Sequence, residues 1–146
     1  MDIASDVTSI AHVIQLSIAP VFLLTAVGAM LGVLSSRLSR AVDRARTLEG
    51  RCATAVGDDQ SIMLRQLTVL GRRIRLIYKA MVLCAVCALL ICSVIVTAFA
   101  STLAGTVLAV PIAVLFVAAM LAFIGALLLF LREVHLAITT LSIGTP

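Results

Sequence analysis

Apolar residues of this chain gather in long runs that charged residues do not interrupt. One run extends from Ile10 to Leu34, and a longer one from Ala80 to Leu131. Because a helix needs about 20 apolar residues to cross the hydrocarbon of a bilayer, the longer run holds two spans and a turn. The polar, glycine-containing cluster at 101–106 places that turn. The pattern therefore predicts three transmembrane helices, at about 10–34, 80–101 and 106–131.

The polar stretch between the first and second spans has a helical period of its own. Apolar residues recur there at alternating spacings of four and three, which is typical of the seam of a coiled coil. Gly57 is expected to end the first arm, and Asp58 or Asp59 to cap the second. The pattern predicts an antiparallel helical hairpin over 35–79 that extends spans 1 and 2. Its seam positions are Leu34, Leu38, Ala41, Ala45, Leu48 and Cys52 in one arm and Met63, Leu67, Leu70, Ile74, Ile77 and Met81 in the other.

The hairpin has two interpretations. Basic amphipathic helices also lie flat on a membrane surface, where arginine side chains reach lipid headgroups. The apolar period continues without a break across both predicted membrane boundaries, which favours an upright hairpin.

Composition supports a membrane protein and excludes several other classes of protein. The chain is 62% hydrophobic and only 12% charged, with a mean hydropathy of +1.23, whereas soluble domains are about 45–50% apolar and about 25% charged. These values exclude a soluble globule, a disordered chain and a disulfide-stapled miniprotein. Asp2 and Asp6 occupy the place of the basic residues of a signal peptide, so the first run is expected to be retained. The predicted fold class is an all-α integral membrane protein with one membrane domain over 1–146.

Positive charge predicts the orientation in the membrane. Ten of the 11 lysines and arginines lie between Arg37 and Lys79, whereas the N-terminal tail carries only acids. The positive-inside rule places 35–79 in the cytoplasm, the N-terminus outside and the C-terminus inside. The chain has one Tyr and no Trp, so its basic character indicates contact with anionic headgroups of the inner leaflet and not nucleic acid. The cytoplasmic basic surface comprises Arg37, Arg40, Arg44, Arg46, Arg72, Arg73 and Arg75.

Small and polar residues share one face of the first span. Gly28 and Gly32 form a G-x-x-x-G motif, which lets two helix backbones approach closely. Three accounts fit this stripe: packing against another span of the same chain, self-association, or lining a pore ringed by identical subunits. A buried amide such as that of Gln15 is expected to face protein or water. The candidates for pore lining or helix packing are Gln15, Ser17, Thr25, Gly28, Gly32, Ser35, Ser36 and Ser39.

Other reactive residues give no sign of catalysis. Cys84, Cys87 and Cys92 fall inside the second span without further zinc ligands nearby, so they are expected to pack as small apolar residues. The sequence has no paired carboxylates, nucleophile elbow or phosphate-binding loop. Arg132 and Glu133 follow the third span and are expected to form local pairs that anchor the helix end. We predict no catalytic site, no metal and no cofactor.

Four segments carry a resemblance to a known family. They are Ile14–Leu24, Leu38–Arg46, Arg72–Ile77 and Leu129–Val134. Together they resemble a bacterial family of small membrane proteins catalogued as domain of unknown function 2721. The resemblance implies a multi-pass protein of the bacterial inner membrane with this three-span layout, and it implies no activity.

Three hypotheses about function follow. The first is a homo-oligomeric channel. A chain with three spans builds a transport path most readily by repeating one helix around a centre, here the first span. Arginines at the cytoplasmic mouth of this path would favour anions. The alternative is a non-conducting scaffold or accessory subunit whose basic hairpin docks a partner or anionic lipid. The third and most remote is a membrane enzyme that uses Arg132 and Glu133. The partners expected are the protein itself, membrane lipid and ions.

Overall fold

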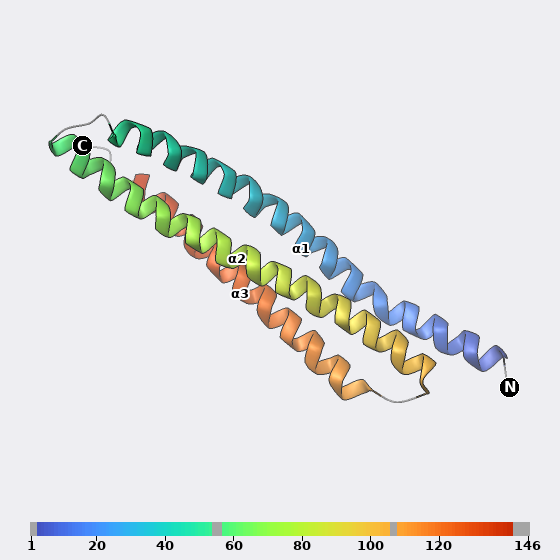
Figure 1. Ribbon diagram of the computed structural model, residues 1–146. Coiled ribbons are helices and arrows are strands. Elements are labelled where there is room, and N and C mark those ends of the chain that lie inside the picture. The colour runs from blue at the N-terminus through green and yellow to red at the C-terminus, as the bar shows by residue number, and fades with distance from the viewer. Residues whose placement is uncertain (1–2, 54–56, 106–107, 142–146) are drawn as a thin grey trace. The chain divides into compact units, whose positions relative to one another are not determined.

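The protein is all-α in its computed structural model, which describes residues 3–53, 57–105 and 108–141. Its helices are α1 (Ile3–Cys52), α2 (Asp58–Leu103) and α3 (Ala109–Leu141), shown in Figure 1. All three are long and apolar enough to cross a membrane. The sequence prediction of three membrane helices in a multi-pass protein is therefore confirmed at this level. All three helices continue beyond the predicted spans: α1 runs on to Cys52, α2 begins at Asp58 and α3 runs on to Leu141.

Glycines lie just outside both ends of α2, whereas α1 ends at Cys52, five residues before the Gly57 that was expected to end it. Gly57 precedes α2 with a φ of +80°, and Gly105 follows it with a φ of +62°. Residues with a β-carbon rarely adopt this left-handed conformation, which explains glycine at both turns. Pro111 lies in the first turn of α3, where its missing N–H removes no helical hydrogen bond.

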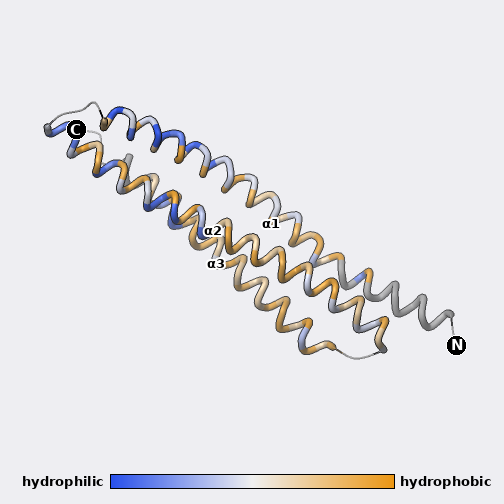
Figure 2. Tube along the Cα trace, in the orientation of Figure 1, coloured by the Kyte–Doolittle hydropathy of each residue, from blue (hydrophilic) through white to orange (hydrophobic). Residues whose placement is uncertain are grey.

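The chain divides into two compact units, and each contains part of every helix. One unit comprises Met1–Met30 and Leu83–Ile124, and the other comprises Leu31–Val82 and Gly125–Pro146. We call them the apolar unit and the polar unit. The hydrophilic segments of α1 and α2 in Figure 2 belong to the polar unit.

The apolar unit buries small and medium side chains from all three helices. Its fully or nearly buried residues are Val27 of α1, Cys84, Cys87, Ile91 and Val94 of α2, and Ala119 of α3. Many large apolar side chains face outward instead, among them Phe22, Leu89 and Leu121. In water such exposure would be costly, but outward apolar residues are what a lipid-facing surface requires.

The polar unit has its own core, which contains one charged residue. Its buried residues are Leu34 and Ala41 of α1, Leu70, Ile77 and Ala80 of α2, and Ala126 and Glu133 of α3. Every seam position predicted for the two arms is buried or half-buried. The apolar stripes predicted for these arms are thus the sides that turn away from solvent.

Buried positions recur every seven residues along each helix. In α3 they are Ala119, Ala126 and Glu133. A seven-residue repeat keeps one face of a helix toward its neighbours over many turns. Glu133 therefore occupies a place where this line of small residues would continue with another apolar side chain. The corresponding lines are Pro20, Val27, Leu34 and Ala41 in α1 and Leu70, Ile77, Cys84 and Ile91 in α2.

Candidate functional site

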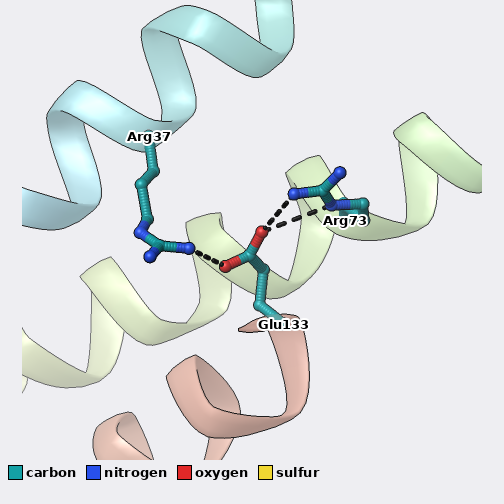
Figure 3. Close-up of polar contacts among 3 residues, drawn as sticks. All are labelled: Arg37, Arg73 and Glu133. Atoms are coloured by element: carbon teal, nitrogen blue, oxygen red, sulfur yellow. Dashed lines mark hydrogen bonds and ion pairs between the residues drawn. The ribbon is translucent and has the colours of Figure 1, made fainter. Parts of the chain in front are cut away.

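A buried carboxylate joins all three helices in the polar unit. Glu133 of α3 is only 1% exposed, and both of its oxygens accept hydrogen bonds from arginine (Figure 3). Arg37 Nη1 of α1 donates to Oε2 at 2.9 Å. Arg73 of α2 donates to Oε1 from Nη2 at 2.8 Å and from Nε at 3.3 Å. We call these three residues the Glu133 cluster.

An aromatic ring holds the first of these arginines from a second side. The guanidinium carbon of Arg37 lies 5.0 Å from the ring centroid of Phe130. A cation over an aromatic face within about 6 Å is attracted to the ring by roughly 0.5–1 kcal/mol at partly exposed sites. Phe130 and Glu133 are three residues apart and share a side of α3. Together they hold the Arg37 side chain against α3.

The cluster satisfies its carboxylate but is not electrically neutral. Two guanidinium groups against one carboxylate leave a net charge of about +1. The side chains of Arg37 and Arg73 are 33% and 26% exposed, so each guanidinium group is partly open to the surroundings of the protein. A buried charge is tolerated only when it is paired and hydrogen-bonded, as that of Glu133 is here.

This arrangement corrects the expectation for the end of the third span. Glu133 was expected to pair locally and anchor its own helix, whereas its partners lie 96 and 60 residues away on the other two helices. Arg37 and Arg73 were expected to belong to an open basic surface, and both are half-buried. The other members of that surface, Arg40, Arg44, Arg46, Arg72 and Arg75, are exposed.

The small and polar stripe of α1 is exposed along its described length. A β-carbon built on Gly28 or Gly32 would meet no atom within 4 Å. Close packing of the two glycines against another span of the same chain, the first of the three accounts, therefore does not occur in the structure. Ser17 lies outside the residues whose side chains are described. The remaining candidates are all exposed: Gln15, Thr25, Gly28, Gly32, Ser35, Ser36 and Ser39.

Several hydroxyl groups of the membrane helices donate to carbonyl oxygens of their own helices. Thr25 Oγ1 of α1 donates to the carbonyl of Val21 at 3.2 Å, and Thr97 Oγ1 of α2 donates to that of Ser93 at 2.6 Å. Such bonds let a hydroxyl face lipid without an unsatisfied proton. The exposed Thr25 oxygen can still accept a hydrogen bond, because a hydroxyl that donates its proton keeps its acceptor lone pairs.

The cysteines and the acids form no metal centre in the described ranges. Cys84 and Cys87 are completely buried, as their predicted packing role requires, whereas Cys92 is exposed. Within 3–53, 57–105 and 108–141, no three His, Cys, Asp or Glu side chains come close enough to hold a metal ion.

The sequence contained one signal for the Glu133 cluster. Extending the line of Ala119 and Ala126 by seven residues reaches Glu133. A carboxylate that continues an apolar line points to a buried partner of opposite charge. This seven-residue line does not reveal which arginines supply the opposite charge, because both are distant from Glu133 in the sequence.

Comparison with known proteins gives a family and no activity. A family model described as "Protein of unknown function (DUF2721)" matches residues 17–143. The match covers most of the chain and confirms the resemblance drawn from the four sequence segments. No curated protein and no solved structure matches the chain.

Proposed function

Since the chain belongs to the family described as protein of unknown function (DUF2721), a description that assigns no activity, we propose a function from the geometry. The protein is a homo-oligomeric membrane channel whose ion path is lined by α1. The N-terminus lies outside, and the basic hairpin over 35–79 and the C-terminus lie in the cytoplasm. The localisation is the bacterial inner membrane.

The observation that carries this proposal is the free stripe on α1. Gly28 and Gly32 have open space in front of them, and the neighbouring Ser35, Ser36 and Ser39 are exposed in the single chain. The opposite side of α1, with Val27 and Leu34, is buried. The packing of α2 and α3 thus uses one side of α1 and leaves its small, polar side exposed.

Small residues on a lipid-facing helix favour contact with another helix. Lipid tails gain little from packing against glycine, whereas a second helix can approach closely and gain van der Waals contacts and hydrogen bonds. A polar amide such as that of Gln15, which is exposed in the chain, also favours protein or water over hydrocarbon. In a ring of subunits with α1 toward the centre, the stripe meets the α1 helices of neighbouring subunits as well as the water of the path.

Charge at the cytoplasmic end favours anions in this path. Arg40, Arg44 and Arg46 come after the stripe in the sequence of α1 and are exposed. Of the three, only Arg46 lies on the side of the helix that carries the stripe. A ring of such residues at the mouth of a pore concentrates anions and repels cations. Chloride is therefore the ion to test first, with potassium as the comparison.

The number of subunits is the first measurement. We expect native mass spectrometry of the protein in nanodiscs to show four or more copies, since fewer helices cannot surround a central path. A monomer or a dimer would refute the pore.

A matched pair of variants then tests the lining. Gly28→Leu places a large side chain on the stripe, and Ala85→Leu places the same side chain at an exposed position of α2, outside the proposed lining. Gly28→Leu should reduce chloride flux into liposomes at least tenfold or abolish assembly, whereas Ala85→Leu should leave both within about twofold of the unaltered protein. Gln15→Leu should also change flux. Equal behaviour of the two leucine variants would contradict a pore lined by the stripe.

A non-conducting scaffold or accessory subunit is the second candidate. The arm of α2 in the polar unit exposes Ile62, Leu64 and Val69 beside its arginines. A contiguous exposed apolar patch is typical of a surface that docks a partner, and Ile62 and Val69, seven residues or about two turns apart, share one side of this arm. A stable oligomer that shows no flux under any ion gradient would favour this second function.

A further inference from the structure

The Glu133 cluster lies where the predicted membrane spans end. Arg37 is the first charged residue after the first span, and Glu133 comes two residues after Leu131, the end of the third. Arg73 of α2 reaches the same carboxylate, which brings its guanidinium to this level. The cluster therefore lies beside the headgroups of one leaflet, whichever side of the membrane that is.

The two arginines have donors that Glu133 does not use. A guanidinium carries five N–H donors, and Arg37 directs one of them to Glu133 while Arg73 directs two. Within the described residues, the guanidinium groups of Arg37 and Arg73 donate hydrogen bonds to Glu133 alone. Both side chains are also partly exposed. They can therefore bind an additional anion without releasing the carboxylate.

The surroundings of the cluster add positive charge and no exposed acid. Arg40, Lys79 and Arg132, each within a few residues of a span end, are exposed. Between 66 and 79 the sequence has no acid, and between 132 and 137 the only acid is the buried Glu133. The charge left over in the cluster is thus not balanced by a neighbouring carboxylate at this level.

We propose that Arg37 and Arg73 form a binding site for the phosphate of an anionic phospholipid, with Glu133 as the positioning residue that holds the two guanidinium groups in place. Paired guanidinium groups are suited to phosphate because their planar forks make several charge-assisted hydrogen bonds at once. A glycerophospholipid supplies this group at the level of the cluster. Its acyl chains would lie along the outward apolar surface of the helices.

This inference rests on the membrane placement in the proposed function but not on conduction. If the protein binds the lipid but shows no ion flux, the lipid site is supported and the channel is refuted. If the protein conducts ions but has no preference for anionic lipid, the channel is supported and the lipid site is refuted. The two proposals therefore fail separately.

Native mass spectrometry of the full chain in detergent micelles tests the site. The fraction of protein carrying one lipid is measured while phosphatidylglycerol, phosphatidylcholine or sodium phosphate is added. We expect one phosphatidylglycerol per chain to bind before others, at least tenfold more tightly than phosphatidylcholine. Arg37→Gln and Arg73→Gln should each weaken this first binding at least tenfold.

Two matched controls remove the same charge outside the cluster. Arg44 and Arg65 are exposed and lie seven and eight residues farther from the membrane than Arg37 and Arg73, which is about 10–12 Å along a helix. That distance exceeds the screening length of about 8 Å at physiological salt. Arg44→Gln and Arg65→Gln should therefore change the binding by less than about twofold.

One further variant separates lipid binding from folding. Arg73→Lys keeps the charge beside Glu133 but loses the fork, so the helices should still fold while the first lipid binds several-fold more weakly. The proposal is overturned if Arg37→Gln and Arg73→Gln weaken binding no more than the two controls. It is also overturned if phosphatidylcholine binds equally well, or if sodium phosphate at equal concentration displaces the lipid, which would make the ligand a free anion.

Discussion

Replacing Glu133 by glutamine tests whether the buried carboxylate holds the three helices together. Glutamine has nearly the shape of glutamate, so Glu133→Gln opens no cavity. It removes the negative charge that faces Arg37 and Arg73 at 2.9 and 2.8 Å. One side-chain oxygen becomes an amide group, which presents N–H donors to a guanidinium that also only donates. Two positive charges are then left close together without their shared acid.

The expected loss lies between the values for buried and surface ion pairs. Removing one partner of a fully buried pair costs about 3–5 kcal/mol, whereas exposed pairs contribute about 0–1 kcal/mol. Glu133 is buried, but Arg37 and Arg73 are 33% and 26% exposed and regain some hydration when the pair is lost. We therefore expect Glu133→Gln to lower the free energy of unfolding by about 2–3 kcal/mol, between these limits. At about 2–4 °C per kcal/mol for a chain of this size, the melting temperature should fall by about 4–12 °C.

Thermal unfolding in one detergent, followed by circular dichroism, measures this difference. A control variant replaces the whole cluster with apolar side chains of similar size: Arg37→Met, Arg73→Met and Glu133→Leu together. Because no charge is then left without its partner, this triple variant should be at least as stable as Glu133→Gln and close to the unaltered protein. A melting temperature for Glu133→Gln within about 1 °C of the unaltered protein would refute the structural role assigned to the carboxylate.

Two other predictions concern the apolar unit. Ala119 is completely buried, so Ala119→Leu should overpack the core and lower the free energy of unfolding by about 1–3 kcal/mol. Ala113→Leu, at an exposed position of the same helix, should leave the stability nearly unchanged. Equal melting temperatures of the two variants would contradict the packing. Cys92 is exposed and Cys84 is buried, so an apolar maleimide should label the folded protein at Cys92 well before Cys84, and similar labelling rates by mass spectrometry would contradict the burial.

Much of the architecture could be predicted from the sequence because a membrane imposes a simple rule on hydropathy. Backbone groups in hydrocarbon must be satisfied within a helix, so an uncharged run of sufficient length is a span. Gly57 and Gly105 marked the turns, since both need a positive φ. The seven-residue repeat through Leu70 and Ile77 likewise predicted which side of α2 is buried.

The Glu133 cluster could not be predicted in the same way. Local pattern shows which side of a helix is buried, but not which residue on another helix it meets. Arg37 and Arg73 have the same sequence environment as exposed arginines such as Arg40 and Arg72. Only the packing of the three helices distinguishes them, and it brings together residues separated by 60 and 96 positions.

The late position of Glu133 in the chain has a consequence for biogenesis. A ribosome makes Arg37 and Arg73 long before Glu133, so the first two helices enter the membrane while both guanidinium groups lack their acid. Two like charges brought near each other oppose early closure of these helices. The carboxylate arrives directly after the last apolar run and turns that repulsion into attraction. Synthesis thus delays consolidation of the polar unit until the third helix has been made.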